Sequence, residues 1–316
     1  MTILGEIILP GESKTINMEI AKLQTMTPLI IPIIVNRSKT KGPTVLLSAA
    51  IHGDEINGVE IVRQIITQKI NKPKIGTIIC IPVINVFGFV NQKREFPDGR
   101  DLNRVFPGNK TGSLASRVAY HLLKEVLPHV DYAIDFHSGG RTRFNAAQLR
   151  IVPNNIELKV LANIFNTPFV LYSRNISGTY RISCDKMGVK CLLFEGGKSS
   201  DINNTVTNYG VEGTKRILHH LGMLNTRIKI VDPTEKPIYL QKASWIRART
   251  SGMFHSFTTI GSYATKGQLL ATISDPYGKE EHKVKAPNSG YIINVNDAPI
   301  VYQGDAIYHI SEAIES

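Results

Sequence analysis

The chain has 316 residues, of which 42% are hydrophobic and 20% are charged, a composition typical of one large or two medium globular domains. No apolar run reaches the ~18 residues of a membrane span, and Met1–Pro10 carries Glu6 and lacks the basic start of a signal peptide. Three unpatterned cysteines predict buried thiols in a reducing compartment. We therefore expect a cytoplasmic protein with no membrane segment.

The formal net charge of +11 is distributed unevenly along the chain. Residues 227–316 hold 10 Lys and Arg against 9 Asp and Glu, so nearly all of the excess lies in residues 1–226. Such a positive field suits a nucleic acid or a small anionic substrate, or it simply keeps the surface soluble. Because the sequence has no long Lys/Arg block with interleaved aromatic residues, we expect no nucleic-acid partner.

Strand-like and helix-like segments alternate from about residue 44 to residue 224, after a strand-like start. This alternation predicts an α/β fold, in which helices flank a mostly parallel or mixed sheet. The expected strands are Leu29–Val35, Thr44–Ala50, Thr77–Ile84, Tyr132–His137, Gln148–Val152, Phe169–Tyr172 and Lys190–Glu195. The expected helices are Asn57–Ile70, Ser113–Leu127, Ile156–Phe165 and Val211–Leu221.

The pattern changes after Leu224, where only short strand-like runs separated by Gly, Pro and Asp follow. They predict a small, barrel-like all-β module. Asp232–Pro237 has the composition of a linker, so we divide the chain into a catalytic domain of residues 1–225 and a β domain of residues 226–316. The expected strands of the module are Met253–Phe257, Leu269–Ile273, Lys283–Lys285, Tyr291–Val295 and Ala306–Ile310.

Metal-ligating residue types stand at the ends of two predicted strands. His52 and Glu55 follow the strand Thr44–Ala50, and His137 ends another apolar strand. Because imidazole and carboxylate are good zinc ligands and strand ends are where sites assemble, the three predict a metal site. The alternative for His52 and Glu55 is a turn hydrogen bond, which is the commoner role of a His beside an acid.

Two further features supply charged groups. Glu195 ends a strand and precedes two glycines; it is a candidate general base, or an edge acid that caps a turn. The turn-rich segment 94–108 holds Arg94, Arg100 and Arg104. Arginine binds carboxylates bidentately, so this segment is a candidate anion clamp, or a solvated loop whose arginines pair with neighbouring acids.

Four motifs in this order resemble the succinylglutamate desuccinylase/aspartoacylase family over roughly residues 25–225. They are His52-Gly-Asp-Glu55, Asp101-Leu-Asn103-Arg104, Asp135-Phe-His137-Ser-Gly-Gly and Phe194-Glu195-Gly-Gly. The family is related to the zinc carboxypeptidases, so the resemblance implies a zinc carboxypeptidase-like mixed sheet. It also implies zinc-dependent hydrolysis of the amide bond of a small anionic N-acyl amino acid.

The resemblance implies a role for each matching residue. One zinc ion per subunit is held by His52, Glu55 and His137. Glu195 activates water as the general base, and Arg94 polarises the scissile carbonyl. Asn103 and Arg104 bind the substrate carboxylate. Apart from the resemblance, four arginines lie in or after the site-forming segments and either bind a second acidic group or are solvated at the surface; they are Arg100, Arg141, Arg143 and Arg150.

The C-terminal module resembles the biotinyl/lipoyl-like β-sandwich hybrids in the order of its turns, from Ser251-Gly252 to Gly304-Asp305. Those carriers modify a lysine in a Met-Lys-Met-like setting. Lys279 and Lys283 lack that setting, so we expect neither lipoylation nor biotinylation. The module also resembles the C-terminal domain of many such deacylases, which implies that it shields or shapes the mouth of the site.

Several alternatives stay open at this point. A carboxypeptidase acting on peptides or polyglutamyl tails requires a wide mouth. An N-acetyl-diaminobutyrate deacetylase requires an acidic residue facing the substrate amine. A zinc-bearing binding protein without catalysis would have no need of Glu195 and Arg94. A homo-oligomer is compatible with the sequence.

Overall fold

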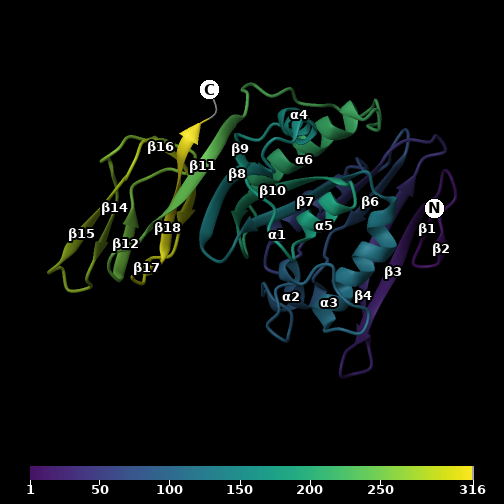
Figure 1. Cartoon of the computed structure of the whole chain (residues 1–316), viewed down its shortest axis with the longest axis horizontal. Coiled ribbons are helices and arrows are strands. Elements are labelled where there is room, and N and C mark those ends of the chain that lie inside the picture. The colour runs from purple at the N-terminus through teal and green to yellow at the C-terminus, as the bar shows by residue number, and fades with distance from the viewer. Residues whose placement is uncertain (315–316) are drawn as a thin grey trace.

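The computed structural model describes residues 1–314, which are built around one twelve-stranded mixed sheet (Figure 1). From the C-terminal edge, its strands are β13 (Tyr263–Ala264), β16 (Gly290–Asn296), β18 (Ala306–Ile314), β11 (Ile238–Arg247), β9 (Phe169–Tyr172), β8 (Arg143–Ile151), β10 (Lys190–Lys198), β7 (Tyr132–Gly139), β5 (Thr44–Ala49), β6 (Thr77–Ile81), β4 (Pro28–Arg37) and β3 (Ser13–Lys22).

The centre of the sheet is parallel, and its margins are mixed. Strands β10, β7, β5 and β6 run parallel, whereas β8 is antiparallel to β10 and β4 is antiparallel to β6. Every residue of β5 and β6 is buried, because helices cover both faces of the sheet. This explains why their sequences are continuous apolar runs rather than alternating ones.

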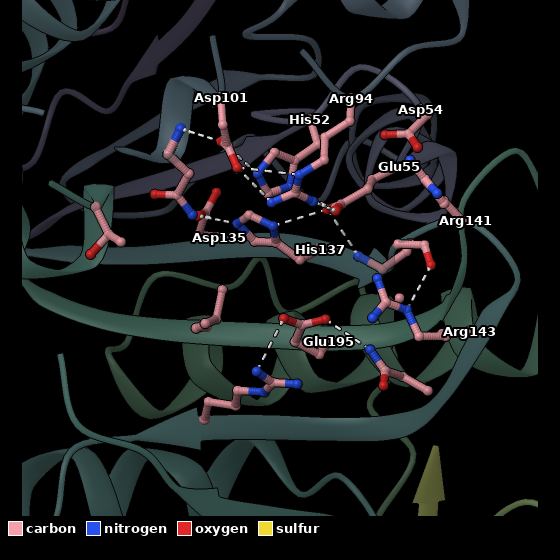
Figure 2. A pocket seen from close by; sticks show the side chains of 18 of the residues that line it. His52, Asp54, Glu55, Arg94, Asp101, Asp135, His137, Arg141, Arg143 and Glu195 are labelled. Carbon is pink, nitrogen blue, oxygen red and sulfur yellow. Dashed lines mark hydrogen bonds and ion pairs between the residues drawn. The ribbon is translucent and has the colours of Figure 1, made fainter. Parts of the chain in front are cut away.

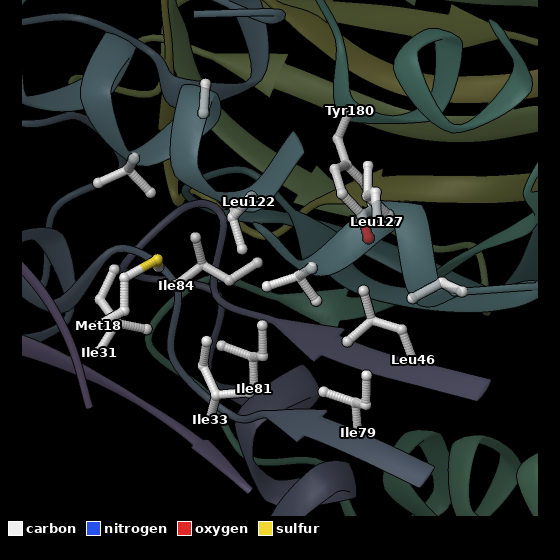
Figure 3. Packing of buried hydrophobic residues seen from close by; sticks show 14 of the residues in the cluster. Met18, Ile31, Ile33, Leu46, Ile79, Ile81, Ile84, Leu122, Leu127 and Tyr180 are labelled. Carbon is white, nitrogen blue, oxygen red and sulfur yellow. The ribbon is translucent and has the colours of Figure 1, made fainter. Parts of the chain in front are cut away.

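Helices pack on both faces of the sheet through two separate apolar clusters. One cluster includes Ile61, Leu158 and Val211 and joins α1 (Ile56–Thr67), α4 (Ile156–Phe165) and α6 (Asn204–His220) to the sheet. The other, shown in Figure 3, joins α3 (Leu114–His121) and α5 (Tyr180–Lys186), with α2 (Val86–Asn91) at its edge. A 3₁₀ turn (Leu102–Arg104), a π-helical turn (Leu122–Val126) and a second 3₁₀ turn (Leu127–His129) complete the helical segments.

After α6, the described chain forms strands and turns but no helix, as the sequence predicted. Part of this module is a separate four-stranded sheet of β15 (Glu281–Lys285), β14 (Leu269–Ser274), β12 (Gly252–Ser256) and β17 (Ile300–Val301). Its other long strands extend the central sheet, and β16 also pairs directly with β8. The β module therefore reaches the strands that carry the site. Near the N-terminus, β1 (Thr2–Ile3) and β2 (Glu6–Ile7) form a separate two-stranded antiparallel sheet.

Most expected elements are present, with shifts of a few residues at their ends. The sequence pattern did not predict α2, α5 or β11, and the predicted start of α6, Val211, is seven residues too late. The reason for the late start is visible in the packing. Gly210 and Gly213 interrupt the apolar pattern, yet they let α6 lie close against Ile61 and Phe165, where a Cβ would collide. The long Ser113–Leu127 helix is instead an α-helix that ends at His121 and continues as a π-helical turn.

Two further expectations concern the cysteines and membrane-spanning helices. Cys80, Cys184 and Cys191 are buried free thiols, as expected. Of the helices in residues 1–314, none is both long enough and apolar enough to cross a bilayer. The predicted boundary between residues 225 and 226 falls in the loop between α6 and β11, and the division into two domains stays a prediction.

Candidate active site

The segment His52-Gly-Asp-Glu55 forms a tight turn between β5 and α1. The chain leaves β5 at Ala50, whose φ of 49° lies in the left-handed region that few non-glycine residues adopt. Gly53 packs against the backbone of Gly88 so closely that a Cβ there would overlap it. This turn places His52 and Glu55 on the same side of the sheet end.

The structure brings together the three residues that the sequence predicted as metal ligands. His52, Glu55 and His137 are all buried, and one potential ligand atom from each lies within 4.8 Å of the others. Nδ1 of His52 is 2.7 Å from Oε1 of Glu55, and Nδ1 of His137 is 2.9 Å from Oε2. Figure 2 shows both imidazole rings directed toward this carboxylate.

A second layer of carboxylates holds the outer nitrogen of each imidazole. Nε2 of His52 lies 3.1 Å from Asp101, and Nε2 of His137 lies 2.7 Å from Asp135, which in turn accepts a hydrogen bond from Ser48. Such partners keep the proton on Nε2 and leave the Nδ1 lone pair for a metal. From the sequence, Asp101 was expected only as a possible partner of the nearby arginines, which its contact with Arg94 bears out, and Asp135 was given no role. One signal was available, because residues 135 and 137 share a face of one strand.

The electrostatics of the cluster favour a positive charge among the three residues. Burial alone would lower the pKa of both histidines, but Glu55 and Asp101 raise the pKa of His52, and Asp135 and Glu55 raise the pKa of His137 well above its usual value. Burial would likewise raise the pKa of Glu55, yet the two histidines lower it. Two imidazoles and one carboxylate in such a field fit a zinc ion by donor type and by charge.

Arg94 lies beside this cluster on the loop after α2. Its Nη1 is 3.3 Å from Oε1 of Glu55, and its Nη2 is 2.8 Å from Oδ2 of Asp101. Buried Asn85 holds the loop by donating to the carbonyl oxygen of Arg94 at 3.1 Å. The Arg94 side chain is about one third exposed and lines the cavity, while two carboxylates fix the position of its guanidinium.

The other predicted residues of the arginine-rich segment separate into two groups. Asn103 and Arg104 line the cavity, and Asn103 Oδ1 accepts from the backbone N–H of Tyr180 at 2.8 Å. That bond directs the Nδ2 group of Asn103 as the donor available to a ligand. Arg100 does not line the cavity, and its Nη1 pairs with Asp98 at 2.5 Å. A substrate contact from Arg100 therefore stays a prediction without support from this geometry.

Glu195 occupies the wall of the cavity opposite His52 and Glu55 (Figure 2). It pairs in register with His137 on the neighbouring parallel strand, so both side chains emerge at the same level of the sheet. Oε2 of Glu195 accepts from Nδ2 of Asn145 at 2.9 Å, and Oε1 lies 3.7 Å from Nη1 of Arg150. Arg150 thus reaches the cavity beside the predicted base.

These residues surround one cavity of about 1000 Å³. Arg141 and Arg143 line it as well, and burial together with their mutual repulsion and Arg94 lowers the pKa of Arg143. The β module contributes Trp245 and Asn294 to the lining. Sequence reasoning missed both, because nothing in a strand pattern shows which distant strand will pair with the site.

A mixed sheet with a His–Glu–His group and a glutamate facing it across a cavity is typical of metal-assisted hydrolases. Comparison with known families is consistent with this class. The family model of the succinylglutamate desuccinylase/aspartoacylase catalytic domain matches residues 41–221, more than half of the chain. The chain belongs to this family of N-acyl amino acid deacylases, as its motifs suggested.

Individual relatives resemble the chain over almost its whole length. It is 26% identical over 310 residues to an N-alpha-acetyl-L-2,4-diaminobutyric acid deacetylase of Halomonas elongata, across 91% of this chain and 87% of that protein. The product-bound structure of the ectoine utilization protein EutE (DoeB) of Ruegeria pomeroyi matches with a TM-score of 0.83 and 22% identity, over 96% of this chain and 95% of that one. A succinylglutamate desuccinylase of Silicibacter sp. matches with a TM-score of 0.82 and 24% identity, over 95% of each chain. The structural matches establish the shared α/β fold.

Proposed function

We propose that the protein is a zinc-dependent amidohydrolase that removes the acyl group from a small anionic N-acyl amino acid. The observation that carries this proposal is the buried cluster of His52, Glu55 and His137, which faces Glu195 across one cavity. The zinc carboxypeptidase-like fold and the single zinc per subunit that the motifs imply belong to the same proposal.

Each step of the reaction has a residue of suitable chemistry. Zinc, when bound by His52, Glu55 and His137, would supply Lewis-acid activation of water and of the scissile carbonyl. Glu195 takes the proton from the attacking water and later delivers it to the leaving amine. Arg94 donates to the oxygen on which negative charge develops, and the carboxylates that fix its guanidinium keep this donor in place.

The positive lining of the cavity supports an acidic substrate. Arg104 donates to the carbonyl oxygen of Asn103 at 2.7 Å, and Arg143 donates to that of Gly140 at 3.2 Å, contacts with neutral acceptors that do not neutralise the two charges. Asn103 and Arg104 bind the α-carboxylate and orient the amide bond. Arg143 and Arg150 line the same cavity, which supports them as the residues that bind a second anionic group.

A second candidate is the deacetylation of N-acetyl-diaminobutyrate, the reaction named for the relative from Halomonas elongata. Its substrate carries an amine, which calls for an acid in the cavity. Asp54 lines the cavity, and its buried Oδ1 has no hydrogen-bond partner in the described part of the chain. A polyglutamyl or peptide tail is a third candidate, because a cavity of about 1000 Å³ is at the upper end of the usual size.

A panel of substrates separates these candidates. The zinc-loaded protein is assayed with N-acetylaspartate, N-succinylglutamate, Nα-acetyl-diaminobutyrate and a short glutamyl peptide, and kcat/KM is compared. The acidic acyl amino acids are expected to be turned over at least tenfold faster than the other two. A preference for the diaminobutyrate derivative that is lost in Asp54→Asn would select the second candidate. Zinc binding with no turnover of any substrate would select a binding protein.

A further inference from the structure

Glu195 is connected to the β module by two consecutive amide hydrogen bonds. Nδ2 of Asn294 donates to Oδ1 of Asn145 at 2.7 Å, and Nδ2 of Asn145 donates to Oε2 of Glu195 at 2.9 Å. Asn294 and Asn145 border the cavity but are only 1% and 4% exposed, so both side chains are largely shielded from water. The two residues are paired in register across β16 and β8, although 149 positions separate them in sequence.

The hydrogen bond from Asn294 determines which end of the Asn145 amide faces Glu195. The two ends of an asparagine amide have nearly the same shape, and rotation about χ2 exchanges the oxygen and the nitrogen. In one orientation Asn145 donates to Glu195, whereas in the other it presents its own oxygen to a carboxylate. Because Asn294 donates to Oδ1 of Asn145, only the donating orientation satisfies both contacts.

The buried environment of Asn294 argues against a role in packing alone. Its Oδ1 is buried and, among residues 1–314, has no hydrogen-bond partner. An unpaired buried acceptor costs free energy that an apolar residue of similar volume would avoid. This cost is explained if the Nδ2 group of Asn294 is required as the donor to Asn145.

We propose that Asn294 positions the general base Glu195, acting through Asn145. The inference rests on the proposed function, because it assumes that Glu195 accepts the proton of water. With Oε2 held by Asn145 and Oε1 beyond hydrogen-bond distance of Arg150 at 3.7 Å, Oε1 is the oxygen that faces the cavity as acceptor. The catalytic site is therefore completed by a strand outside the matched catalytic domain of residues 41–221.

The test compares two asparagines of the same strand. Asn294→Ala removes the donor to Asn145. Asn296→Ala is the matched control, because Asn296 is also buried on β16 but bonds to Thr142 and Ala306 instead of the site. We expect Asn294→Ala to lower kcat on the order of tenfold with KM changed by less than about twofold, since orientation of a reacting group affects the chemical step. Asn296→Ala should keep the wild-type kcat.

A double-mutant cycle shows whether Asn294 acts through Asn145. Asn145→Ala should lower kcat at least as much as Asn294→Ala, and the double variant should be no slower than Asn145→Ala. Additive losses would overturn the proposed relay. Asn294→Asp, which keeps the shape but replaces the donor with a carboxylate, should be slower than Asn294→Ala, and it serves as the second variant if the alanine form does not fold.

Two further measurements separate the failure of this inference from the failure of the proposed function. The side-chain NH₂ protons of Asn145 should exchange with water slowly in the wild type and in Asn296→Ala, and faster in Asn294→Ala, with zinc content unchanged in all three. If Glu195→Gln keeps wild-type activity, the proposed base is wrong. If Glu195→Gln is inactive while Asn294→Ala matches Asn296→Ala in kcat and exchange, the inference alone is overturned.

Discussion

The two walls of the cavity hold their functional groups by different means. On the metal wall, His52, Glu55 and His137 contact one another and two outer carboxylates, so charged groups surround each ring. On the base wall, Glu195 is held by the neutral amide of Asn145, which is itself held by Asn294. The first wall is a network of charges and the second is a chain of amides.

This difference follows from what each wall has to do. A cation site needs a strong negative field, and buried carboxylates around the imidazoles provide it. A general base has to be oriented without a full positive charge in direct contact, because such a charge would stabilise the carboxylate and make it a weaker proton acceptor. A neutral amide donor orients Oε2 without adding charge, while the Arg150 guanidinium lies 3.7 Å from Oε1, close enough for an ion pair but too far for a hydrogen bond.

The largest expected effect comes from breaking the metal wall. His137→Ala removes one of three ligands, leaves Asp135 without its imidazole partner and leaves Glu55 with one imidazole instead of two. We expect zinc content, measured by elemental analysis, to fall to a small fraction of one ion per chain, with activity below detection. His219→Ala, an exposed histidine at the end of α6, is the control and should keep its zinc. Full zinc occupancy in both His52→Ala and His137→Ala would contradict the metal site.

The next largest effect comes from the base wall. Glu195→Ala and the isosteric Glu195→Gln should bind zinc as the wild type does but turn over substrate about 10²–10⁴ times more slowly, which is the usual contribution of general acid–base catalysis. Zinc content and kcat are measured on the same samples. Wild-type turnover by either variant would show that another group accepts the proton.

The two walls also differ in how far they could be predicted from sequence. The metal ligands stand within short motifs, since His52 and Glu55 share one turn and His137 lies near the end of the neighbouring strand β7. Their spacing and residue types are local, so a single sequence was sufficient to select them. The central strands were equally accessible, because burial on both faces produces continuous apolar runs such as β5.

The partners of Glu195 could not be found in this way. Asn145 and Asn294 contribute through a pairing of β8 with β16 that no short motif encodes. Strand β11 was missed as well, because Leu240 is the one buried residue among its ten and its apolar pattern is accordingly weak. Residues that meet through the pairing of strands distant in sequence can be identified only from the structure, whereas residues that share one turn can be identified from the sequence.

A smaller effect is expected when the outer layer of the metal wall is weakened. Asp135→Asn keeps the shape of the side chain but removes the charge that faces Nε2 of His137. Zinc affinity, measured by competition with a chelator, should fall about 10–100-fold, as is usual for such partners. Asp131→Asn is the control, since Asp131 accepts from the backbone of Thr44, away from the cavity. Equal affinities of the two variants would mean that Asp135 does not orient the ligand.

The last effect concerns pH, because the pKa of a histidine behind the base wall and the pKa values of the two metal-wall histidines are shifted in opposite directions. His309 lies behind the base wall, stacked on Trp245 at 4.4 Å between ring centroids. Burial, with the nearby charge of Arg150, lowers the pKa of His309 to about 4, whereas the pKa values of His52 and His137 are raised. A neutral imidazole behind the base wall adds no positive charge there near neutral pH.

The consequence for stability has a definite sign. The unfolded chain takes up a proton on His309 as the pH falls through about 6.5, and the folded chain does so only near pH 4. The free energy of unfolding should therefore be unaffected by His309 above pH 6.5 and should fall by up to about 3 kcal/mol between pH 6.5 and 4. His309→Phe keeps a ring against Trp245 but cannot titrate, so denaturant unfolding at pH 7, 5 and 4 should show a smaller loss than the wild type. The exposed control His255→Phe should lose as much as the wild type, and equal losses in all three proteins would mean that His309 is not held neutral.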